Sequence, residues 1–184
     1  EMFYPELWSV RNPYLYTAIT EVRVSNKLTD RYRTTFGIRK FDWDEHTGFS
    51  LNGEPTKILG VCLHHDLGCL GSAVNTRALE RQLQMMKDMG ANAVRTSHNP
   101  PAPELLDICD RNGLLGQDEA FDMGRKRKSP YDQARYFDER HEKDLTDQVL
   151  RDRNHPSLCG ASETKYWSNG NMPMPTRSVS KPPT

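Results

Sequence analysis

Residues 56–66 read TKILGVCLHHD, residues 93–100 read AVRTSHNP, and residues 114–119 read LLGQDE. In each stretch an apolar run ends in polar side chains, and a helical pattern follows. Repeated units of strand, polar loop and helix are typical of a parallel sheet whose strands end at one common rim. Because βα barrels build their catalytic sites on that rim, these stretches predict an enzyme.

The chain has 184 residues, whereas a complete barrel of eight such units needs about 250. Residues 14–41 alternate between apolar and polar side chains, which is typical of half-buried antiparallel strands. Asn52-Gly53 predicts a two-residue hairpin turn, because both positions tolerate a positive φ. The sequence therefore predicts an α/β fold, with the first half of a (β/α)8 TIM barrel over residues 46–158 and the end of a β-rich domain over residues 1–45.

Three helical patterns lie between the predicted strands. The first is capped by Asn75 or Thr76 and stopped by Gly90, and the second runs from Pro103 to Gly113. The third covers residues 138–151, and its many charges fit the solvated outer face of a barrel. The side chains that we expect to be buried are Leu79, Leu83, Met86 and Met89 in the first helix, Leu105, Leu106, Ile108 and Cys109 in the second, and Leu145, Val149 and Leu150 in the third.

The composition argues against several classes of protein. Twenty-five basic and 25 acidic residues balance to a net charge of zero, so no global field attracts nucleic acid or an anionic membrane. No apolar stretch has the length of a transmembrane helix, and the first residues carry no signal-peptide pattern. A targeting signal lost with the start of the gene stays open, and so does the compartment, cytoplasm or periplasm. The four cysteines lack CxxC spacing and are expected to be small buried hydrophobic side chains: Cys62, Cys69, Cys109 and Cys159.

The first two polar clusters contain histidines. Adjacent side chains on an extended segment point to opposite faces, so His64 and His65 cannot easily bind one metal ion together. We favour sugar binding or orientation by one of them and a structural role for the other. In the second cluster, Pro100 keeps Asn99 out of helical geometry, and the imidazole of His98 and the amide of Asn99 can bond hydroxyl groups. Capping of the next helix is an alternative role for His98.

The third cluster, Asp118-Glu119, ends another predicted strand. Strand alternation directs one carboxylate towards the rim and the other outward, and a rim glutamate can bind substrate, a cation or a proton. Retaining glycoside cleavage needs two facing carboxyl groups about 5 Å apart, and this rim supplies one candidate. The basic run at residues 125–128 offers nucleic-acid binding as a competing function, but it lacks interleaved aromatic residues, so we favour a solvated loop.

Seven motifs occur along the chain. They are Leu7-Trp8-Ser9 with Asn12-Pro13-Tyr14-Leu15-Tyr16, Phe36-Gly37-Ile38-Arg39, Leu51-Asn52-Gly53, Gly60-Val61-Cys62-Leu63-His64-His65-Asp66, Arg95-Thr96-Ser97-His98-Asn99-Pro100, Asp118-Glu119-Ala120, and Arg151-Asp152-Arg153-Asn154-His155-Pro156-Ser157. In these residues and in their order, about residues 1–158 of the chain resemble glycoside hydrolase family 2, and most nearly its bacterial β-galactosidases.

The resemblance implies that residues up to about 41 end an immunoglobulin-like β-sandwich and that the barrel begins near residue 56. It also implies that Glu119 falls where some family members hold a magnesium ion. Asp122 stands near the place of a second ligand histidine in those members, so we expect no metal ligands here and Mg²⁺ only in intact relatives. The resemblance implies that His65 and His98, supported by Arg95, bind a terminal β-galactoside, and their place at the rim adds Asn99 and Glu119 as candidates.

Two further departures from the family concern the chemistry. Cys62 replaces the usual asparagine of its motif, which removes an amide that could hydrogen-bond in the pocket. After Ser157 the family continues with three apolar residues and Trp-Ser-x-Gly-Asn-Glu, whose glutamate is the general acid/base. Here Trp167-Ser168-Asn169-Gly170-Asn171 ends in Met172, and methionine cannot transfer a proton. We therefore expect no catalytic residue in this chain.

A frameshift explains the last departure. Residues 160–170 can be encoded by a set of codons that, read in the neighbouring frame with a preceding T, encodes Trp-Ser-Ile-Gly-Asn-Glu. We hypothesise that one nucleotide was gained or lost near Leu158 or Cys159, so that residues 159–184 form an out-of-frame tail. Because the tail from Met172 lacks apolar periodicity, we expect it to be disordered.

The sequence thus predicts part of a retaining β-galactosidase that is itself inactive, because both catalytic glutamates are missing. The alternative is a non-catalytic carbohydrate-binding or structural remnant. An insoluble product is a third outcome, because half a barrel leaves an unpaired strand edge and exposed inner faces. The expected partner is a β-galactoside, without nucleic acid or membrane.

Overall fold

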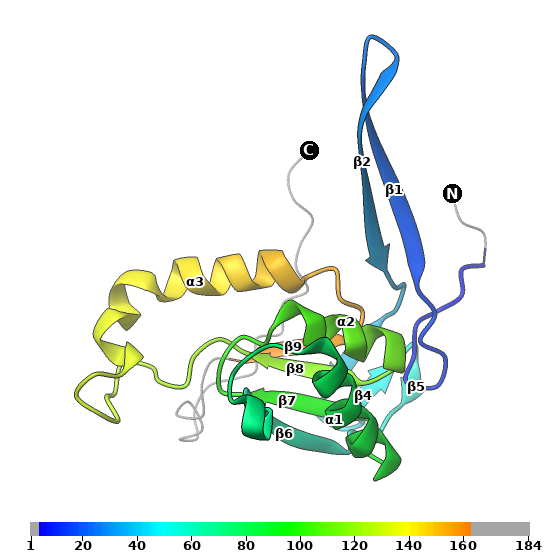
Figure 1. The fold of residues 1–184 in the computed structure, drawn as a ribbon. Coiled ribbons are helices and arrows are strands. Elements are labelled where there is room, and N and C mark those ends of the chain that lie inside the picture. The colour runs from blue at the N-terminus through cyan, green and yellow to red at the C-terminus, as the bar shows by residue number, and fades with distance from the viewer. Residues whose placement is uncertain (1–3, 163–184) are drawn as a thin grey trace.

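The computed structural model describes residues 4–162, which form three sheets with helices packed on the parallel one (Figure 1). In chain order the elements are β1 (Tyr16–Val24), β2 (Lys27–Phe36), β3 (Phe41–Asp44), β4 (Gly48–Leu51), β5 (Glu54–Pro55), β6 (Gly60–His64), the 3₁₀ helix η1 (Gly68–Leu70), α1 (Thr76–Asp88), β7 (Ala93–Ser97), α2 (Pro103–Asn112), β8 (Leu115–Glu119), the 3₁₀ helix η2 (Gln133–Tyr136), α3 (Phe137–Asp152) and β9 (Leu158–Ser162).

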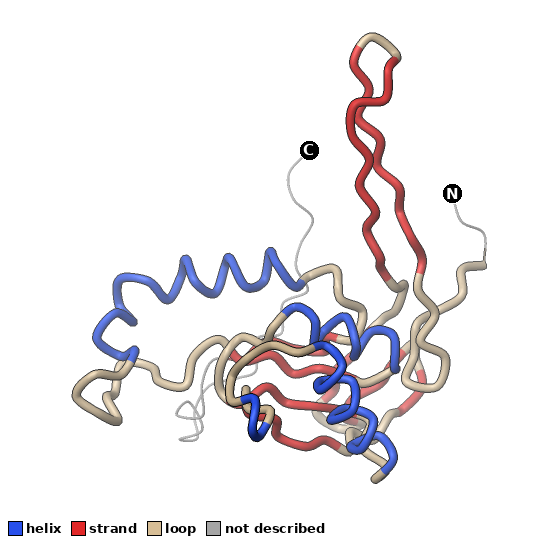
Figure 2. Tube along the Cα trace, in the orientation of Figure 1, coloured by secondary structure: helices blue, strands red, loops and turns tan. Residues whose placement is uncertain are grey.

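The first sheet is a long antiparallel hairpin of β1 and β2, so the predicted antiparallel strands are confirmed, whereas the predicted burial of one face is not observed. Tyr16 pairs with Phe36 at its base, where the two rings stack with centroids 5.7 Å apart. Figure 2 shows the hairpin standing away from the parallel sheet. Most of its side chains are exposed on both faces, because within the described residues no second sheet covers it.

The second sheet joins β3, β4 and β5 in antiparallel order. Its tight turn lies at Asn52-Gly53, where Leu51 pairs with Glu54 and both turn residues have a positive φ, 56° and 85°. This conformation is the one that a two-residue hairpin turn requires. The predicted turn is therefore confirmed.

The third sheet consists of four parallel strands in the order β6-β7-β8-β9. Helix α1 connects β6 to β7, α2 connects β7 to β8, and α3 connects β8 to β9. This is the succession of a βα barrel, and four strands are half of the eight that such a barrel needs. Because side chains alternate along a strand, Val94 faces the helices whereas its neighbour Arg95 faces the side that the barrel interior would occupy.

The main core fills the space between the parallel sheet and the helices α1 and α2. Leu83, Leu106 and Leu114 are fully buried there. The ends of both helices follow the predicted signals, since the side chain of Asn75 caps α1 and Gly113 ends α2 in the left-handed conformation. The prediction for Met89 was wrong: this side chain is 74% exposed, because α1 ends at Asp88 and Met89 lies in the turn beyond it.

Helix α3 departs further from its predicted packing. Leu145 is partly buried as expected, but Val149 and Leu150 are exposed, so the prediction for these two was wrong. The buried positions near the end of the helix are the polar residues Gln148 and Asp152. Figure 1 shows the helix extending to one side of the sheet, which is why its apolar residues have little to pack against.

A second core closes the amino-terminal end of the parallel sheet. Trp8 from the start of the chain, with Phe49 and Leu51 from β4, packs against Ala93 and Leu115, which begin β7 and β8. The indole of Trp8 is fully buried and donates a hydrogen bond of 2.8 Å to the backbone carbonyl of Asp110. The β-rich segment therefore covers the end of the parallel sheet at which the strands begin, and it leaves the opposite rim, at which they end, open.

The cysteines are only partly as predicted. Cys109 is buried and Cys159 half-buried, whereas Cys62 and Cys69 are exposed, so the prediction for the latter pair was wrong. Cys62 lies on β6 on the face turned away from the helices, and Cys69 lies in the 3₁₀ helix η1 that follows β6. Apolar neighbours in the sequence did not reveal which face of the strand Cys62 occupies.

The fourth parallel strand reaches Ser162, four residues beyond the expected domain boundary at 158, and pairs with β8 up to Glu119. The remainder of the expected tail, residues 163–184, lies outside the described residues. Within residues 4–162, no helix combines the length and the apolar character needed to cross a bilayer.

Candidate active site

The open rim gathers polar side chains from two neighbouring strands, β7 and β8. Arg95 is the third residue of β7, His98 follows β7 directly, and Glu119 is the last residue of β8. Because parallel strands end at one edge, residues far apart in the sequence come together there. The peptide bond between Ser97 and His98 is cis.

Glu119 is the centre of this cluster and is 2% exposed. Its Oε1 accepts two hydrogen bonds from Arg95, 2.8 Å from Nε and 2.6 Å from Nη2. Its Oε2 lies 3.0 Å from Nδ1 of His98. A carboxylate only accepts hydrogen bonds, so Nδ1 of His98 acts as the donor in this contact, and Nη2 of Arg95 lies 3.3 Å from the same nitrogen. The side chains of Arg95, His98 and Glu119 therefore form one connected group at the rim, which we call the rim cluster.

Arg95 also contacts β6. Its Nη1 lies 3.3 Å from Sγ of Cys62 and 3.2 Å from Oγ of Ser97. The hydrogen bond from Arg95, with a second one from Ser97, lowers the pKa of the Cys62 thiol. Cys62 is thus an exposed thiol beside a cation, which favours the nucleophilic thiolate form. The sequence predicted Cys62 as a small buried side chain and as a departure from the family, and it did not indicate this environment.

The two adjacent histidines point to different partners, as strand alternation predicted. His65 binds the loop before α1, with Nε2 2.9 Å from the carbonyl oxygen of Ser72. His64 instead packs edge-on against His98, with ring centroids 5.5 Å apart. The structure therefore brings His64, which we had not chosen, next to the rim cluster. The sequence signal that could have identified His64 is its position two residues after Cys62, because this spacing places both side chains on the same face of β6.

Asn99 is exposed and lies one residue beyond the cluster. It lines a small cavity of about 20 Å³, together with His64 and His65, between the loops that follow β6 and β7. Such a volume holds about one water molecule and is too small for a sugar ring. Asn99 and His65 therefore line a gap beside the rim and have no described hydrogen bond to Arg95, His98 or Glu119.

The second carboxylate of the pair, Asp118, points away from Glu119 into the layer of helices. It is 1% exposed, and Oγ1 of Thr96 donates a hydrogen bond of 3.4 Å to its Oδ1. Burial, together with the neighbouring carboxyl of Asp152, raises the pKa of Asp118 to about 7, against the charge of Arg151. Arg151 in turn holds Asp152 through contacts of 2.6 and 2.7 Å. Asp118 is therefore a structural carboxyl that favours its protonated form.

The rim cluster does not suit a magnesium ion. Mg²⁺ prefers several oxygen ligands, whereas both oxygens of Glu119 already bind the nitrogens of Arg95 and His98. Asp122, the other candidate position, pairs with Lys128 at 3.1 Å. The carboxylates at both positions are thus already paired with basic side chains, which disfavours a cation between these residues.

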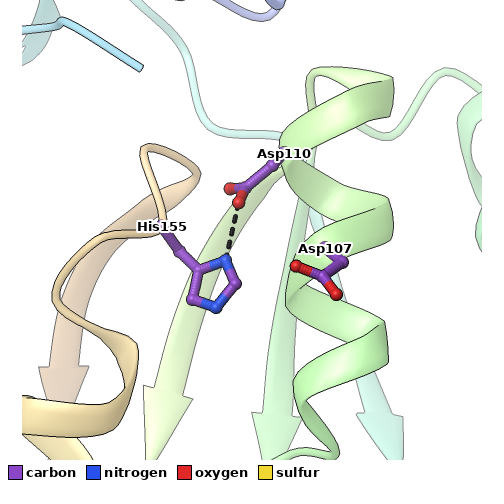
Figure 3. Close-up of side chains that lie close together, drawn as sticks. All are labelled: Asp107, Asp110 and His155. Carbon is purple, nitrogen blue, oxygen red and sulfur yellow. Dashed lines mark hydrogen bonds and ion pairs between the residues drawn. The ribbon is translucent and has the colours of Figure 1, made fainter. Parts of the chain in front are cut away.

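One group within residues 4–162 has spacing suited to a metal: Asp107, Asp110 and His155, with ligand atoms within 4.8 Å of one another. Figure 3 shows the two aspartates on α2 and His155 on the loop before β9. Both oxygens of Asp110 are already in use, one 2.6 Å from Nδ1 of His155 and one accepting from the backbone N–H of Ser157. Burial opposes protonation of His155, but the bond to Asp110 prevails and raises the pKa of the imidazole. This group fastens the loop before β9 to α2.

The basic run at residues 125–128 lies in an exposed loop, as predicted. Arg125 pairs with Asp138 at 2.6 Å, and Lys128 pairs with Asp122. Half of the run is therefore neutralised by carboxylates from the same chain, and it does not form a continuous basic surface.

Comparison with known proteins identifies the family. Residues 45–181 match the model of the glycosyl hydrolases family 2 TIM barrel domain, and residues 2–39 match a second model named glycosyl hydrolases family 2. A beta-galactosidase of Bacteroides ovatus is 60% identical over 167 residues, covering 91% of this chain and 19% of the relative. A beta-glucuronidase of Streptococcus agalactiae is 37% identical over 163 residues, covering 83% and 27%.

A solved structure has the same fold. A crystal structure of a glycosyl hydrolase family 2 member from Bacteroides cellulosilyticus superimposes with a TM-score of 0.82 at 45% identity, covering 88% of this chain and 21% of that one. The present chain thus spans about a fifth of the length of these relatives. The predicted fold class, half a TIM barrel after the end of a β-sandwich domain, is confirmed. With its barrel and its preceding segment both matched, the chain belongs to glycosyl hydrolase family 2.

Proposed function

We propose that the rim cluster of Arg95, His98 and Glu119 binds the terminal sugar of a β-galactoside in a retaining glycosidase. The observation that carries the proposal is the cluster itself, a buried carboxylate with an imidazole and a guanidinium at the carboxyl ends of β7 and β8. These groups offer both donors and acceptors to sugar hydroxyls. The 60% identity to a beta-galactosidase favours galactoside over the glucuronide of more distant relatives.

We further propose that this chain alone does not hydrolyse its ligand. Retaining hydrolysis needs a carboxylic acid that protonates the glycosidic oxygen and a carboxylate that attacks the anomeric carbon, about 5 Å apart. Within residues 4–162, Glu119 is the one carboxylate in the rim cluster, and three nitrogen atoms of Arg95 and His98 contact it. Asp118 faces the opposite side of the sheet. A single engaged carboxylate can bind a sugar but cannot perform both steps.

Calorimetry on the purified chain tests these proposals. Methyl β-D-galactopyranoside should bind, methyl β-D-glucuronide should bind more weakly, and Glu119→Gln should abolish galactoside binding. Glu142→Gln is the matched control, because Glu142 is exposed on α3. Preference for the glucuronide would overturn the substrate assignment. A folded chain that binds neither sugar would favour the structural remnant, and hydrolysis of a chromogenic β-galactoside at enzyme-like rates would overturn the proposed inactivity.

The frameshift remains a separate proposal, because its main motif lies outside the described residues. The nucleotide sequence of the gene tests it directly. Codons for residues 160–170 that spell Trp-Ser-Ile-Gly-Asn-Glu in the neighbouring frame would support it, and codons that cannot do so would end it.

A further inference from the structure

Glu119 lies beyond the end of the backbone ladder between β7 and β8. The paired residues of these two strands run from Ala93 with Leu115 to Arg95 with Gln117, two residues before Glu119. β8 stays paired with β9 on its other side. Because a strand that leaves its ladder loses the hydrogen bonds that fix its backbone, the end of β8 needs another partner on the side of β7.

The hydroxyl group of Thr96 takes the place of the missing ladder contact. Its Oγ1 accepts a hydrogen bond of 3.2 Å from the backbone N–H of Glu119 and donates one of 3.4 Å to Oδ1 of Asp118. A threonine hydroxyl has one proton and two lone pairs, so the bond to Asp118 leaves the lone pairs available to the N–H of Glu119. Thr96 is 5% exposed, so water does not compete for these bonds.

Asp118 is itself held by side chains from the end of α3. Gln148 and Asp152 reach its carboxyl, and Arg151 binds both oxygens of Asp152 at 2.6 and 2.7 Å. Arg151 also donates a hydrogen bond of 3.1 Å to the carbonyl oxygen of Pro101, which lies between β7 and α2. These contacts fix the carboxyl of Asp118 and therefore the direction in which the hydroxyl of its neighbour donates.

The backbone N–H that Thr96 holds belongs to the central residue of the rim cluster. The side chain of Glu119 contacts Arg95 at 2.6 Å and His98 at 3.0 Å on the opposite side of the sheet. A side chain that recognises a ligand must be held within about 0.5 Å of its productive position. A shift of the backbone of Glu119 would displace both of its carboxylate oxygens, so the contact behind the sheet bears on the geometry of the rim.

We propose that Thr96 is a positioning residue for the rim cluster, because its hydroxyl, oriented by Asp118, holds the backbone of Glu119 in the place from which the carboxylate binds galactose. The inference rests on the proposed galactoside binding at the rim cluster. Thr96 faces the helices and acts on the ligand only through Glu119. A purely structural role of Thr96 would make its loss lower the stability of the chain and leave the affinity for the sugar unchanged.

Thr96→Val tests the proposal, because valine keeps the shape of the side chain and removes the hydroxyl. Calorimetry with methyl β-D-galactopyranoside should show an affinity about tenfold lower, the loss expected when one buried hydrogen bond is removed. Thr96→Ser retains the hydroxyl and should restore the affinity to within about twofold of wild type. Exchange of the amide hydrogen of Glu119, measured by NMR, should be faster in Thr96→Val than in Thr96→Ser.

Ile108→Val is the matched control for a loss of stability. Ile108 is 1% exposed in the core around α2 and is not part of the rim cluster, so its shortening should destabilise the chain without changing the affinity for the galactoside. Full affinity in Thr96→Val, or failure of Thr96→Ser to restore it, would overturn the inference and leave the proposed function intact. Absence of galactoside binding by the wild-type chain would overturn both.

Asp118→Leu provides a second test, which also serves if Thr96→Val does not fold. It removes the acceptor that orients the hydroxyl, and Asp152 keeps its partner Arg151, so no unpaired charge is left behind. Its affinity for the galactoside should fall in the same direction. Because the two side chains act in one relay, the losses of Thr96→Val and Asp118→Leu should not add in the double variant, and additive losses would refute the relay.

Discussion

Arg95 on β7 donates two hydrogen bonds to a single carboxylate oxygen of Glu119 on β8, from Nε at 2.8 Å and from Nη2 at 2.6 Å. Glu119 is almost fully buried, whereas Arg95 is 27% exposed and can reach solvent and ligand. A buried carboxylate is costly without such a partner. The pair therefore stabilises the half-barrel and shapes the rim in which we propose that galactose binds.

Arg95→Met should reduce both the stability of the folded chain and its affinity for the galactoside. The free energy of unfolding should fall by about 2 kcal/mol, less than for a fully buried pair because Arg95 is partly solvated. The affinity for methyl β-D-galactopyranoside should fall about tenfold, since Glu119 loses the donor that fixes its position. Urea unfolding and calorimetry measure these effects. Arg81→Met, on an exposed position of α1, should change neither, and an unaltered stability of Arg95→Met would contradict the structural role of the pair.

Cys62 should be the most reactive of the described cysteines at neutral pH. The hydrogen bond from Arg95 lowers the pKa of its thiol, whereas burial raises the pKa of Cys109 far above its usual range, so that no thiolate forms there. The rate of labelling with a chromogenic disulfide, followed by peptide mass analysis, should be highest at Cys62 and lower at Cys69, which is exposed but has no such partner in the described residues. Arg95→Met should slow labelling at Cys62 alone. Equal rates at Cys62 and Cys69 would refute the effect of the guanidinium.

Asp118→Asn should change how stability depends on pH. The pKa of Asp118 is raised to about 7, so between about pH 4 and pH 7 the folded chain holds a proton that the unfolded chain has released. The wild-type chain therefore loses stability as the pH rises through this window. The amide introduced by Asp118→Asn cannot ionise, so the variant should gain stability relative to wild type from pH 4.5 to pH 8 in urea unfolding.

The critical feature of this prediction is that the stability of Asp118→Asn relative to wild type increases as the pH rises. Asp147→Asn removes an exposed carboxyl from α3 and serves as the control for a general change in net charge. If the stability difference between Asp118→Asn and wild type were the same at pH 4.5 and pH 8, the raised pKa would be refuted.

Gly113→Ala should be strongly destabilising. Gly113 ends α2 with φ at +68°, and a Cβ there would lie 2.4 Å from the carbonyl oxygen of Val10. The left-handed conformation alone costs about 1 kcal/mol, and the backbone overlap should bring the total loss of unfolding free energy to about 3 kcal/mol or more. Gly53→Ala is the control, because Gly53 has φ at +85° but open space around it, and it should cost only about 1 kcal/mol. Equal effects in thermal or urea unfolding would exclude the contact with Val10.

Local sequence signals were sufficient for most of the fold. The turn at Asn52-Gly53, the cap at Asn75 and the stop at Gly113 depend on backbone conformations that few other residues adopt, so they could be predicted without the tertiary structure. The packing of α3 could not be predicted. Its apolar residues Val149 and Leu150 suggested an inner face, but the part of the helix that meets the sheet buries polar side chains instead.

For the candidate site, the sequence alone determined the family motifs and the carboxyl-terminal placement of Arg95, His98 and Glu119, because strand ends and polar loops are encoded locally. Only the tertiary structure decided that these three residues bond to one another, that His64 rather than His65 adjoins His98, and that Cys62 is exposed beside Arg95. The tertiary structure alone also revealed the cavity of about 260 Å³ between the loop after β8 and the start of α3. The physical reason is that contacts across strands depend on the register and facing of the sheet, which bring together residues more than 20 positions apart.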